Sequence, residues 1–158
     1  MQLPQKQQSM PTSPFIYIGA DHAGYALKER LKTYLLEQGF ECEDLGNTDL
    51  DPADDYPDYA ALVTKKVQEN GNNRGILICG TGIGMCIAAN RYKNIRAVNA
   101  STPKQAEMSR RHNNANVLCL GGSVVPFWIA RKIVSVWLNT PFDIAVRHRR
   151  RVSKLDKI

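Results

Sequence analysis

Residues 75–84 read GILICGTGIG, and this stretch decides the fold class. Its first half is a short apolar run, typical of a strand that is buried on both faces of a sheet. Its second half places Gly80, Gly82 and Gly84 at alternate positions ahead of a helical pattern. A buried strand that turns sharply into a helix is half of a parallel strand-helix-strand unit. The stretch therefore predicts an α/β protein with a parallel sheet.

The same alternation of strand and helix continues in both directions along the chain. Strand patterns are predicted at residues 15–19, 40–46, 75–80, 96–100 and 116–121. Helical patterns follow at residues 25–38, 58–70, 83–92, 103–112 and 125–138. Five such strands predict one doubly wound, three-layer sandwich of the flavodoxin or Rossmann-like type, with strand order 2-1-3-4-5. Ligands of such sheets bind beyond the carboxyl ends of strands 1 and 3, where the winding reverses.

Length and composition limit the domain count and the class of protein. With 158 residues, 43% of them hydrophobic, the chain can bury one core and is too short for two ordinary domains. Residues 1–14 have little to bury, so we expect a disordered leader ahead of a single domain at 15–158. The sequence has no apolar run that would span a membrane and no signal-peptide core, so we expect a cytoplasmic protein with no membrane partner. The four cysteines form no CxxC pair, and neither disulfides nor a metal site is indicated.

Most of the net charge of +6 lies at the C-terminus. Residues 145–158 carry six arginines and lysines against the single acid Asp156, a net charge of +5. This basic helix or tail can be a solvated face, a patch for a polyanion, or a clamp for a small anion. Arg147 and Arg151 are four residues apart, so on a helix they project from one side and can grip a phosphate. One basic stripe without interleaved aromatic residues is weak support for nucleic acid, which we do not expect as a partner.

The glycine turn is a candidate binding site. Glycines let the backbone approach a ligand, and the amides of Gly82, Ile83 and Gly84 at the start of the helix can donate to an oxyanion or phosphate. The alternative is a plain turn between strand and helix. The spacing GxGxG differs from the GxGxxG of dinucleotide folds, and no acidic residue follows about twenty positions later, so NAD is rejected and no cofactor is expected.

Cys79 ends the strand directly before this turn. A lone cysteine in a strand is ordinarily a buried structural thiol. At this position, however, a helix N-terminus and nearby cations favour the thiolate form of a cysteine, which can then act as a base. The other cysteines, Cys42, Cys86 and Cys119, lack this setting and are assigned to the core.

Two histidines fall at further candidate positions. Asp21 and His22 end the first strand, across the expected cleft from Cys79, although Asp21 can also cap a helix and His22 can be a satisfied structural histidine. His112 lies in the segment RRHNNAN between the fourth helix and the fifth strand. A His-Asn pair in such a loop can equally be a helix C-cap.

Six segments together resemble the ribose-5-phosphate isomerase B family and its galactose-6-phosphate isomerase relatives. They are GADHAG, DYPDYA, GILICGTGIGMCIAAN, IRAV, SRRHNNANVL and RHRRRV, and the resemblance runs from Phe15 to Val152. It implies an aldose-ketose isomerase, an intramolecular oxidoreductase that interconverts D-ribose 5-phosphate and D-ribulose 5-phosphate through a cis-enediolate without metal or cofactor. It also implies a homodimer or tetramer with its sites at the subunit interfaces.

The resemblance implies a role for each matched residue. Cys79 matches the cysteine that abstracts the proton, and Thr81 matches a hydroxyl that assists proton handling. His112, helped by Asp21, matches the residue that opens the sugar ring. The remaining matched positions are those of the substrate site: Gly80, Gly82, Ile83 and Gly84 around the enediolate, Asn113 in the binding loop, and His22, Arg147 and Arg151 at the phosphate.

One departure from the family pattern concerns the substrate. Family members often have an arginine where this chain has Ser123, so one phosphate contact is missing. His112 points the other way, because galactose-6-phosphate isomerase subunits tend to lack a histidine in this loop. A pentose phosphate is therefore favoured, with allose 6-phosphate or galactose 6-phosphate as the nearest alternatives. The rival from another class is a non-catalytic module that binds a sugar phosphate.

Overall fold

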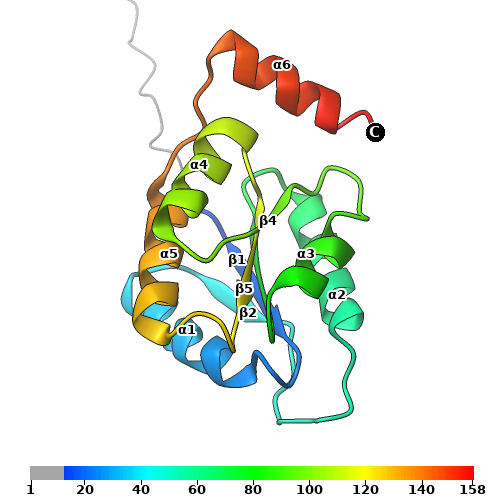
Figure 1. Ribbon diagram of the computed structural model, residues 1–158, viewed down its shortest axis with the longest axis vertical. Coiled ribbons are helices and arrows are strands. Elements are labelled where there is room, and N and C mark those ends of the chain that lie inside the picture. Colours follow the sequence, from blue (N-terminus) through cyan, green and yellow to red (C-terminus); the bar gives the residue numbers. More distant parts are fainter. Residues whose placement is uncertain (1–12) are drawn as a thin grey trace, which may run out of the picture.

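A five-stranded parallel sheet lies at the centre of the computed structural model, which describes residues 13–158 (Figure 1). Its strands are β1 (Ile16–Ala20), β2 (Cys42–Asp44), β3 (Arg74–Cys79), β4 (Ala97–Asn99) and β5 (Val117–Gly121). The helices within the described residues are α1 (Tyr25–Glu37), α2 (Tyr56–Glu69), α3 (Ile83–Ala89), α4 (Pro103–Asn113), α5 (Phe127–Asn139) and α6 (Val146–Leu155). The α/β class is confirmed, whereas residues 1–12 of the expected leader lie outside the described residues.

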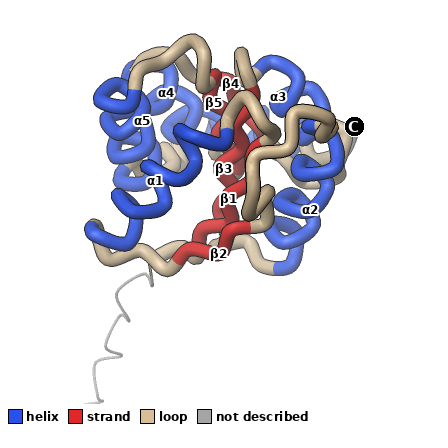
Figure 2. Tube along the Cα trace, turned by 90° about the horizontal axis from the view of Figure 1, so that it is seen from below, coloured by secondary structure: helices blue, strands red, loops and turns tan. Residues whose placement is uncertain are grey.

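Helices cover both faces of the sheet and give the three layers that the sequence predicts (Figure 2). One face packs against α1, α4 and α5, where Leu31, Ile133 and Trp137 are fully buried. The other face packs against α2 and α3 through Val63 and Met85. Helix α6 lies outside these layers and contacts α4 (Figure 1). No helix within residues 13–158 is both long enough and apolar enough to cross a membrane.

The strand order is β2-β1-β3-β5-β4, so the predicted order 2-1-3-4-5 is wrong for the last two strands. Strand β5 pairs with β3 on one side and with β4 on the other. All five residues of β5 are buried, whereas β4 has only three residues, each half-buried. A fully apolar run is stabilised most in the middle of a covered sheet, and a short, partly exposed strand suits its edge. This difference in burial explains why β5 lies next to β3 and β4 lies at the edge of the sheet.

Helix α3 ends at Ala89, earlier than its sequence pattern predicts. The next residue, Asn90, bonds the first residue of β4 with both ends of its side-chain amide. Its Nδ2 donates to the Ala97 carbonyl at 3.0 Å, and the Ala97 N–H donates to its Oδ1 at 2.8 Å. The side chain of Asn90 therefore ties the end of the helix to the start of the edge strand.

The carboxyl ends of β1 and β3 lie side by side, where the winding reverses. Ala20 pairs with Ile78, and the N–H of Asp21 donates to the Ile78 carbonyl at 3.2 Å. The loop after β1 approaches β3 so closely that a Cβ atom at Gly24 would lie 2.4 Å from that carbonyl oxygen. A side chain at position 24 would push the loop away, so the glycine keeps Asp21 beside the end of β3.

Candidate functional site

The Cys79 thiol is held at the carboxyl end of β3 by the glycine turn. Cys79 is 5% exposed, and the N–H of Gly82 donates to its Sγ at 3.2 Å. Gly82 has a φ of +79°, and a Cβ atom there would lie 2.5 Å from Oδ1 of Asn99. Both the left-handed backbone and the lack of space require glycine. The exposed Thr81 completes the turn, since its Oγ1 accepts the Ile83 N–H at 3.3 Å.

Asp21 shapes the loop on the neighbouring strand end. Its side chain is buried, and Oδ1 accepts the N–H groups of Ala23 at 3.0 Å and Gly24 at 3.1 Å. The N-cap of α1 is Gly24, so Asp21 holds the turn ahead of the helix instead of capping it. Because Ala20 pairs with Ile78 and the Asp21 N–H bonds the Ile78 carbonyl, Asp21 and Cys79 lie side by side at the ends of neighbouring strands.

His22 is oriented by a residue that the sequence reasoning missed, Asp54. The ring Nδ1 of His22 lies 2.7 Å from Oδ1 of Asp54, and the backbone N–H of His22 donates to the same oxygen at 3.0 Å. The side-chain hydrogen bond with Asp54 raises the pKa of His22 above its ordinary value. The Asp54 side chain is 5% exposed; burial alone would raise its pKa, but the hydrogen bonds from His22 bring that pKa below the ordinary value.

The loop that carries Asp54 is tied to the body of the protein through Asn47. The Asn47 Nδ2 donates to Oδ2 of Asp54, and the Tyr59 hydroxyl donates to Oδ1 of Asn47. The Asn47 carbonyl accepts from Nζ of the fully buried Lys28 at 3.1 Å. The sequence did contain a signal for this contact, because the acidic segment NTDLDPADDYP follows the second strand at the edge of the sheet where ligands are expected.

Asp21, His22 and Asp54 are also the residues that could hold a metal ion within the described part of the chain. Their candidate ligand atoms all lie within 4.8 Å of one another. In this structure those groups already have other bonds: the Asp21 oxygen serves two loop amides, and Asp54 serves the ring and backbone of His22. The cluster fits a role in orienting His22.

His112 and Cys79 are not brought together within one chain. His112 is in the last turn of α4, which is capped by Asn114 and leads into the amino end of β5. Cys79 instead pairs with Gly121 at the carboxyl end of β5. Four residue steps along a strand span about 13 Å. The two residues therefore lie at opposite ends of the strands, Cys79 at the carboxyl-end edge of the sheet and His112 at its amino-end edge.

The remaining phosphate candidates lie with His112. Its ring stacks on that of His148 in α6, with ring centroids 4.5 Å apart and an angle of 8° between the planes. His148 is buried, and this burial is the main cause that lowers its pKa; the nearby His112 lowers the pKa further. Arg147 and Arg151 flank His148 on the same helix and are exposed. Helix α6 therefore presents both arginines at the His112 edge of the sheet.

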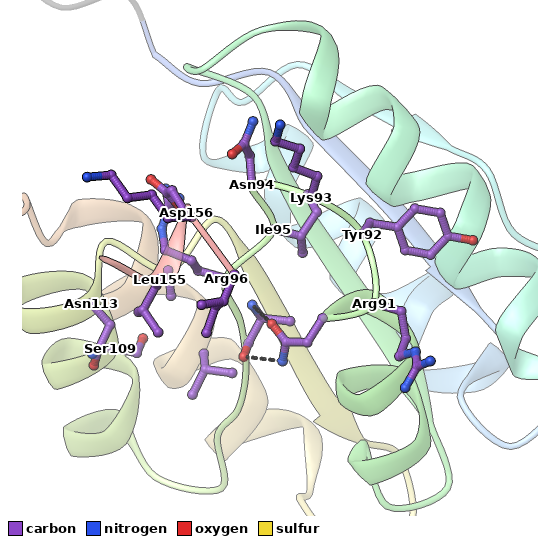
Figure 3. A pocket seen from close by; sticks show the side chains of 16 residues that line it. Arg91, Tyr92, Lys93, Asn94, Ile95, Arg96, Ser109, Asn113, Leu155 and Asp156 are labelled. Atoms are coloured by element: carbon purple, nitrogen blue, oxygen red, sulfur yellow. Dashed lines mark hydrogen bonds and ion pairs between the residues drawn. The ribbon is translucent and has the colours of Figure 1, made fainter. Parts of the chain in front are cut away.

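A cavity of about 970 Å³ opens at this same edge (Figure 3). It is lined by residues 90–98, by Ser109, Asn113 and Ala115, and by residues 155–158. Asn113 is exposed and lines this cavity from the end of α4. An ion pair of 2.6 Å between Arg96 and Asp156 ties the end of α6 to the start of β4. Cys79 does not line this cavity, so it is separate from the glycine turn.

Comparison with known proteins gives the family. A family model described as Ribose/Galactose Isomerase matches residues 16–155. The chain belongs to the ribose/galactose isomerase family. The resemblance of the sequence segments to this group is thereby confirmed.

Individual family members are similar over almost their whole length. A probable ribose-5-phosphate isomerase B of Mycoplasma pneumoniae is 46% identical over 140 residues, which cover 89% of this chain and 91% of that protein. The crystal structure of a ribose 5-phosphate isomerase from Thermotoga maritima is 47% identical with a TM-score of 0.88, covering 92% of this chain and 99% of that one. The ribose-5-phosphate isomerase B of Mycoplasma genitalium, solved with bound ribulose-5-phosphate, is 42% identical with a TM-score of 0.88, covering 92% and 95%.

Ser123, where the family resemblance predicts an arginine, also lies at the glycine turn of this ribose/galactose isomerase. The N–H of Ser123 donates to the Gly80 carbonyl at 2.9 Å, and Gly122 donates to the Cys79 carbonyl at 2.8 Å. The Ser123 side chain is exposed.

Proposed function

We propose that this chain interconverts D-ribose 5-phosphate and D-ribulose 5-phosphate. The observation that carries the proposal is the Cys79 thiol, held by the Gly82 amide at the reversal point of the fold that the family shares. The relative that binds ribulose-5-phosphate supports a pentose phosphate as the substrate. We place the reaction in a single isomerase domain at residues 15–158, in the reducing cytoplasm where a catalytic thiol stays reduced.

Cys79 is the carbon base of the proposed mechanism. As a thiolate it removes the proton from C2 of the open-chain aldose, which gives a cis-enediolate. The hydroxyl proton then passes from O2 to O1 with the help of the Thr81 hydroxyl, and the Cys79 thiol returns its proton to C1 to give the ketose. The negative charge that develops on the sugar oxygens is stabilised by the Gly84 amide at the first turn of α3 and by the Thr81 hydroxyl, whose oxygen is in turn held by the Ile83 amide. Removing one such donor typically costs about 3 kcal/mol of transition-state stabilisation.

We further propose that a second copy of the chain completes each site. Ring opening needs His112, which is at the opposite edge of the sheet from Cys79 of its own chain. Exposed apolar side chains lie near both halves: Ile83 and Ile87 on α3, Ile144 just before α6, and Val146 at the start of α6. Burying them against a second chain would stabilise a homodimer or tetramer. In that assembly His112 and Asn113 of one chain act on sugar held at Cys79 of the other.

The phosphate is assigned to His22 of one chain and to Arg147 and Arg151 of the second. Binding this group, remote from the reacting carbons, supplies energy that holds C2 against the sulfur. The positive charge of α6 then binds the phosphate dianion of the substrate, in line with our proposal that the chain has no nucleic-acid partner. Asp21 is assigned to the support of ring opening, as the family resemblance implies.

Substituting Asp54 is expected to shift the pH dependence of substrate binding. Asp54 raises the pKa of His22, so the ring stays positive to a higher pH than an ordinary histidine. As pH rises through that pKa, the charge is lost and KM for the phosphate ester increases. In Asp54→Asn the rise in KM begins at lower pH, with kcat changed less. KM measured across about pH 5.5 to 8.5, together with an NMR titration of the ring, checks this.

The control for this shift is Asp51→Asn. Asp51 is in the same loop but makes no hydrogen bond to His22, and its Oδ1 accepts the Ala53 N–H. Asp51 raises the pKa of His22 only through its charge and less than Asp54 does, so this variant should shift the pH profile less than Asp54→Asn does. A profile in Asp54→Asn that shifts no further than that of Asp51→Asn would contradict the assignment of His22 to the phosphate.

The test of the proposed function is an isomerase assay on chelator-treated protein. Ribose 5-phosphate, allose 6-phosphate and galactose 6-phosphate are supplied in parallel, and formation of each ketose is followed. We expect the pentose to be turned over with the highest kcat/KM. Faster turnover of a hexose phosphate would keep the mechanism and correct the substrate. A folded protein that binds these esters and converts none of them would favour the sensor module.

A further inference from the structure

Asn99, the last residue of β4, faces the glycine turn from the edge strand, and the sequence reasoning did not single it out. Its Nδ2 donates to the Thr81 carbonyl at 3.3 Å. Its Oδ1 is buried and has no hydrogen-bond partner among the described residues. That oxygen lies against the backbone of Gly82, where only a glycine fits. Asn99 therefore contacts both residues that form the turn below Cys79.

The Thr81 carbonyl and the Gly82 N–H belong to one peptide group. That group is planar and trans, so its C=O and N–H point in opposite directions. Asn99 Nδ2 bonds the oxygen of this group, and Cys79 Sγ accepts from its nitrogen at 3.2 Å. The three groups form a hydrogen-bond chain from the amide of Asn99 through the peptide to the sulfur. Hydrogen bonds in such a series polarise one another.

The stability of β4 does not explain why an asparagine is here. A buried acceptor without a donor destabilises a fold, and an apolar residue would fill the end of an edge strand without that loss. The peptide it contacts is, however, the part of the turn most able to rotate, because Gly82 has the freest backbone. Rotation of this peptide would remove both the bond to Asn99 and the bond to Cys79.

We propose that Asn99 is a positioning residue for Cys79, which holds the Thr81–Gly82 peptide so that its N–H stays directed at the sulfur. The inference rests on the proposed function, and Asn99 does not touch the substrate. Because a misplacement of about 1 Å at a reacting group can cost up to about 100-fold in rate, we expect loss of the contact to lower kcat by about tenfold. KM should change by less than about twofold, since phosphate binding is unaffected.

Three variants test this. Asn99→Asp keeps the shape of the side chain but replaces the donor with a carboxylate facing the Thr81 carbonyl. Asn99→Ala removes the donor together with the unpaired oxygen, so it should fold with a melting temperature at or above that of the wild type. Asn90→Ala is the matched control, because Asn90 bonds β4 at Ala97 and makes no contact with the Thr81–Gly82 peptide.

The measurements are kcat and KM for ribose 5-phosphate and the iodoacetamide alkylation rate of each thiol, resolved by peptide mass spectrometry. We expect kcat to fall in the order wild type, Asn99→Ala, Asn99→Asp, with slower alkylation of Cys79 in both variants. Asn99→Ala should leave the rate at Cys86 unchanged, because Asn99 bonds that thiol through its backbone. Asn90→Ala should match the wild type in kcat and in Cys79 alkylation, and should slow only Cys86, to which Asn90 Nδ2 donates at 3.6 Å. An Asn99→Asp protein with wild-type kcat and wild-type Cys79 alkylation overturns the inference. If the wild type itself converts no ribose 5-phosphate, the proposed function fails, and the alkylation rates still decide the role of Asn99.

Discussion

Replacing Cys79 with alanine is expected to lower kcat for ribose 5-phosphate by about 10²- to 10⁴-fold, the range that a positioned acid or base contributes. No other base in the described structure is so placed at the end of β3. The neighbouring carboxylate, Asp21, is occupied by the amides of its own loop. The alanine variant should still fold, because Cys79 makes no ion pair or disulfide. Turnover, thermal unfolding and calorimetric binding of ribose 5-phosphate check the three parts of this expectation.

The matched control is Cys86→Ser. A hydrogen bond with Cys119 is the main cause that lowers the pKa of Cys86 to about 7, so this thiol ionises near neutral pH. It lies inside α3, however, with its Sγ 3.5 Å from the Ala97 carbonyl and away from the glycine turn. We expect near-normal turnover from Cys86→Ser. Normal turnover in Cys79→Ala, or an inactive Cys86→Ser, would show that Cys79 is not the base.

Two inactive variants are expected to restore activity to each other when co-expressed. Cys79→Ala lacks the base, and His112→Ala lacks the group for ring opening. If each site draws these residues from two chains, a mixed dimer contains one site with neither lesion and one with both. Random assortment makes about half of the dimers mixed, so the mixture should recover about one quarter of wild-type activity.

The control mixture pairs Cys79→Ala with the double variant Cys79→Ala, His112→Ala. No intact site can form in that mixture, so its activity should stay at the level of the single variant. If the mixture of single variants also stays inactive although tagged chains co-purify as mixed dimers, His112 acts within its own chain. The opposite-edge arrangement would then have to change in solution.

The elements that the sequence predicted best are those whose pattern is local. GILICG and VLCLG are apolar throughout, and both became buried strands in the middle of the sheet. The order of β4 and β5 was not predictable in this way, because it depends on which of two strands is more buried in the final fold. That comparison involves the whole sheet.

In the candidate site, too, the contacts between residues close in sequence were predictable and those between distant residues were not. Cys79 and Gly82 form their contact within three residues, and the sequence pattern pointed to it. Asp54 meets His22 across 32 positions, and the acidic loop marks the segment without marking which of its carboxylates makes the contact. Asn99 meets Thr81 across 18 positions, and nothing local in the sequence marks that partner. The position of His112 was open to prediction, because a residue just before a strand lies at the amino end of that strand. The family resemblance implied that His112 opens the sugar ring, but it did not say at which end of the strands this histidine lies.

The separation of Cys79 and His112 to opposite edges of one sheet also bears on how such a gene can diverge. After a duplication, one copy could lose the thiol and the other the histidine, and the two products together would still form one working site in each mixed pair. Each copy would then be retained only in the company of the other. A homomeric ancestor built in this way can therefore give rise to an obligate pair of unlike subunits without passing through an inactive stage.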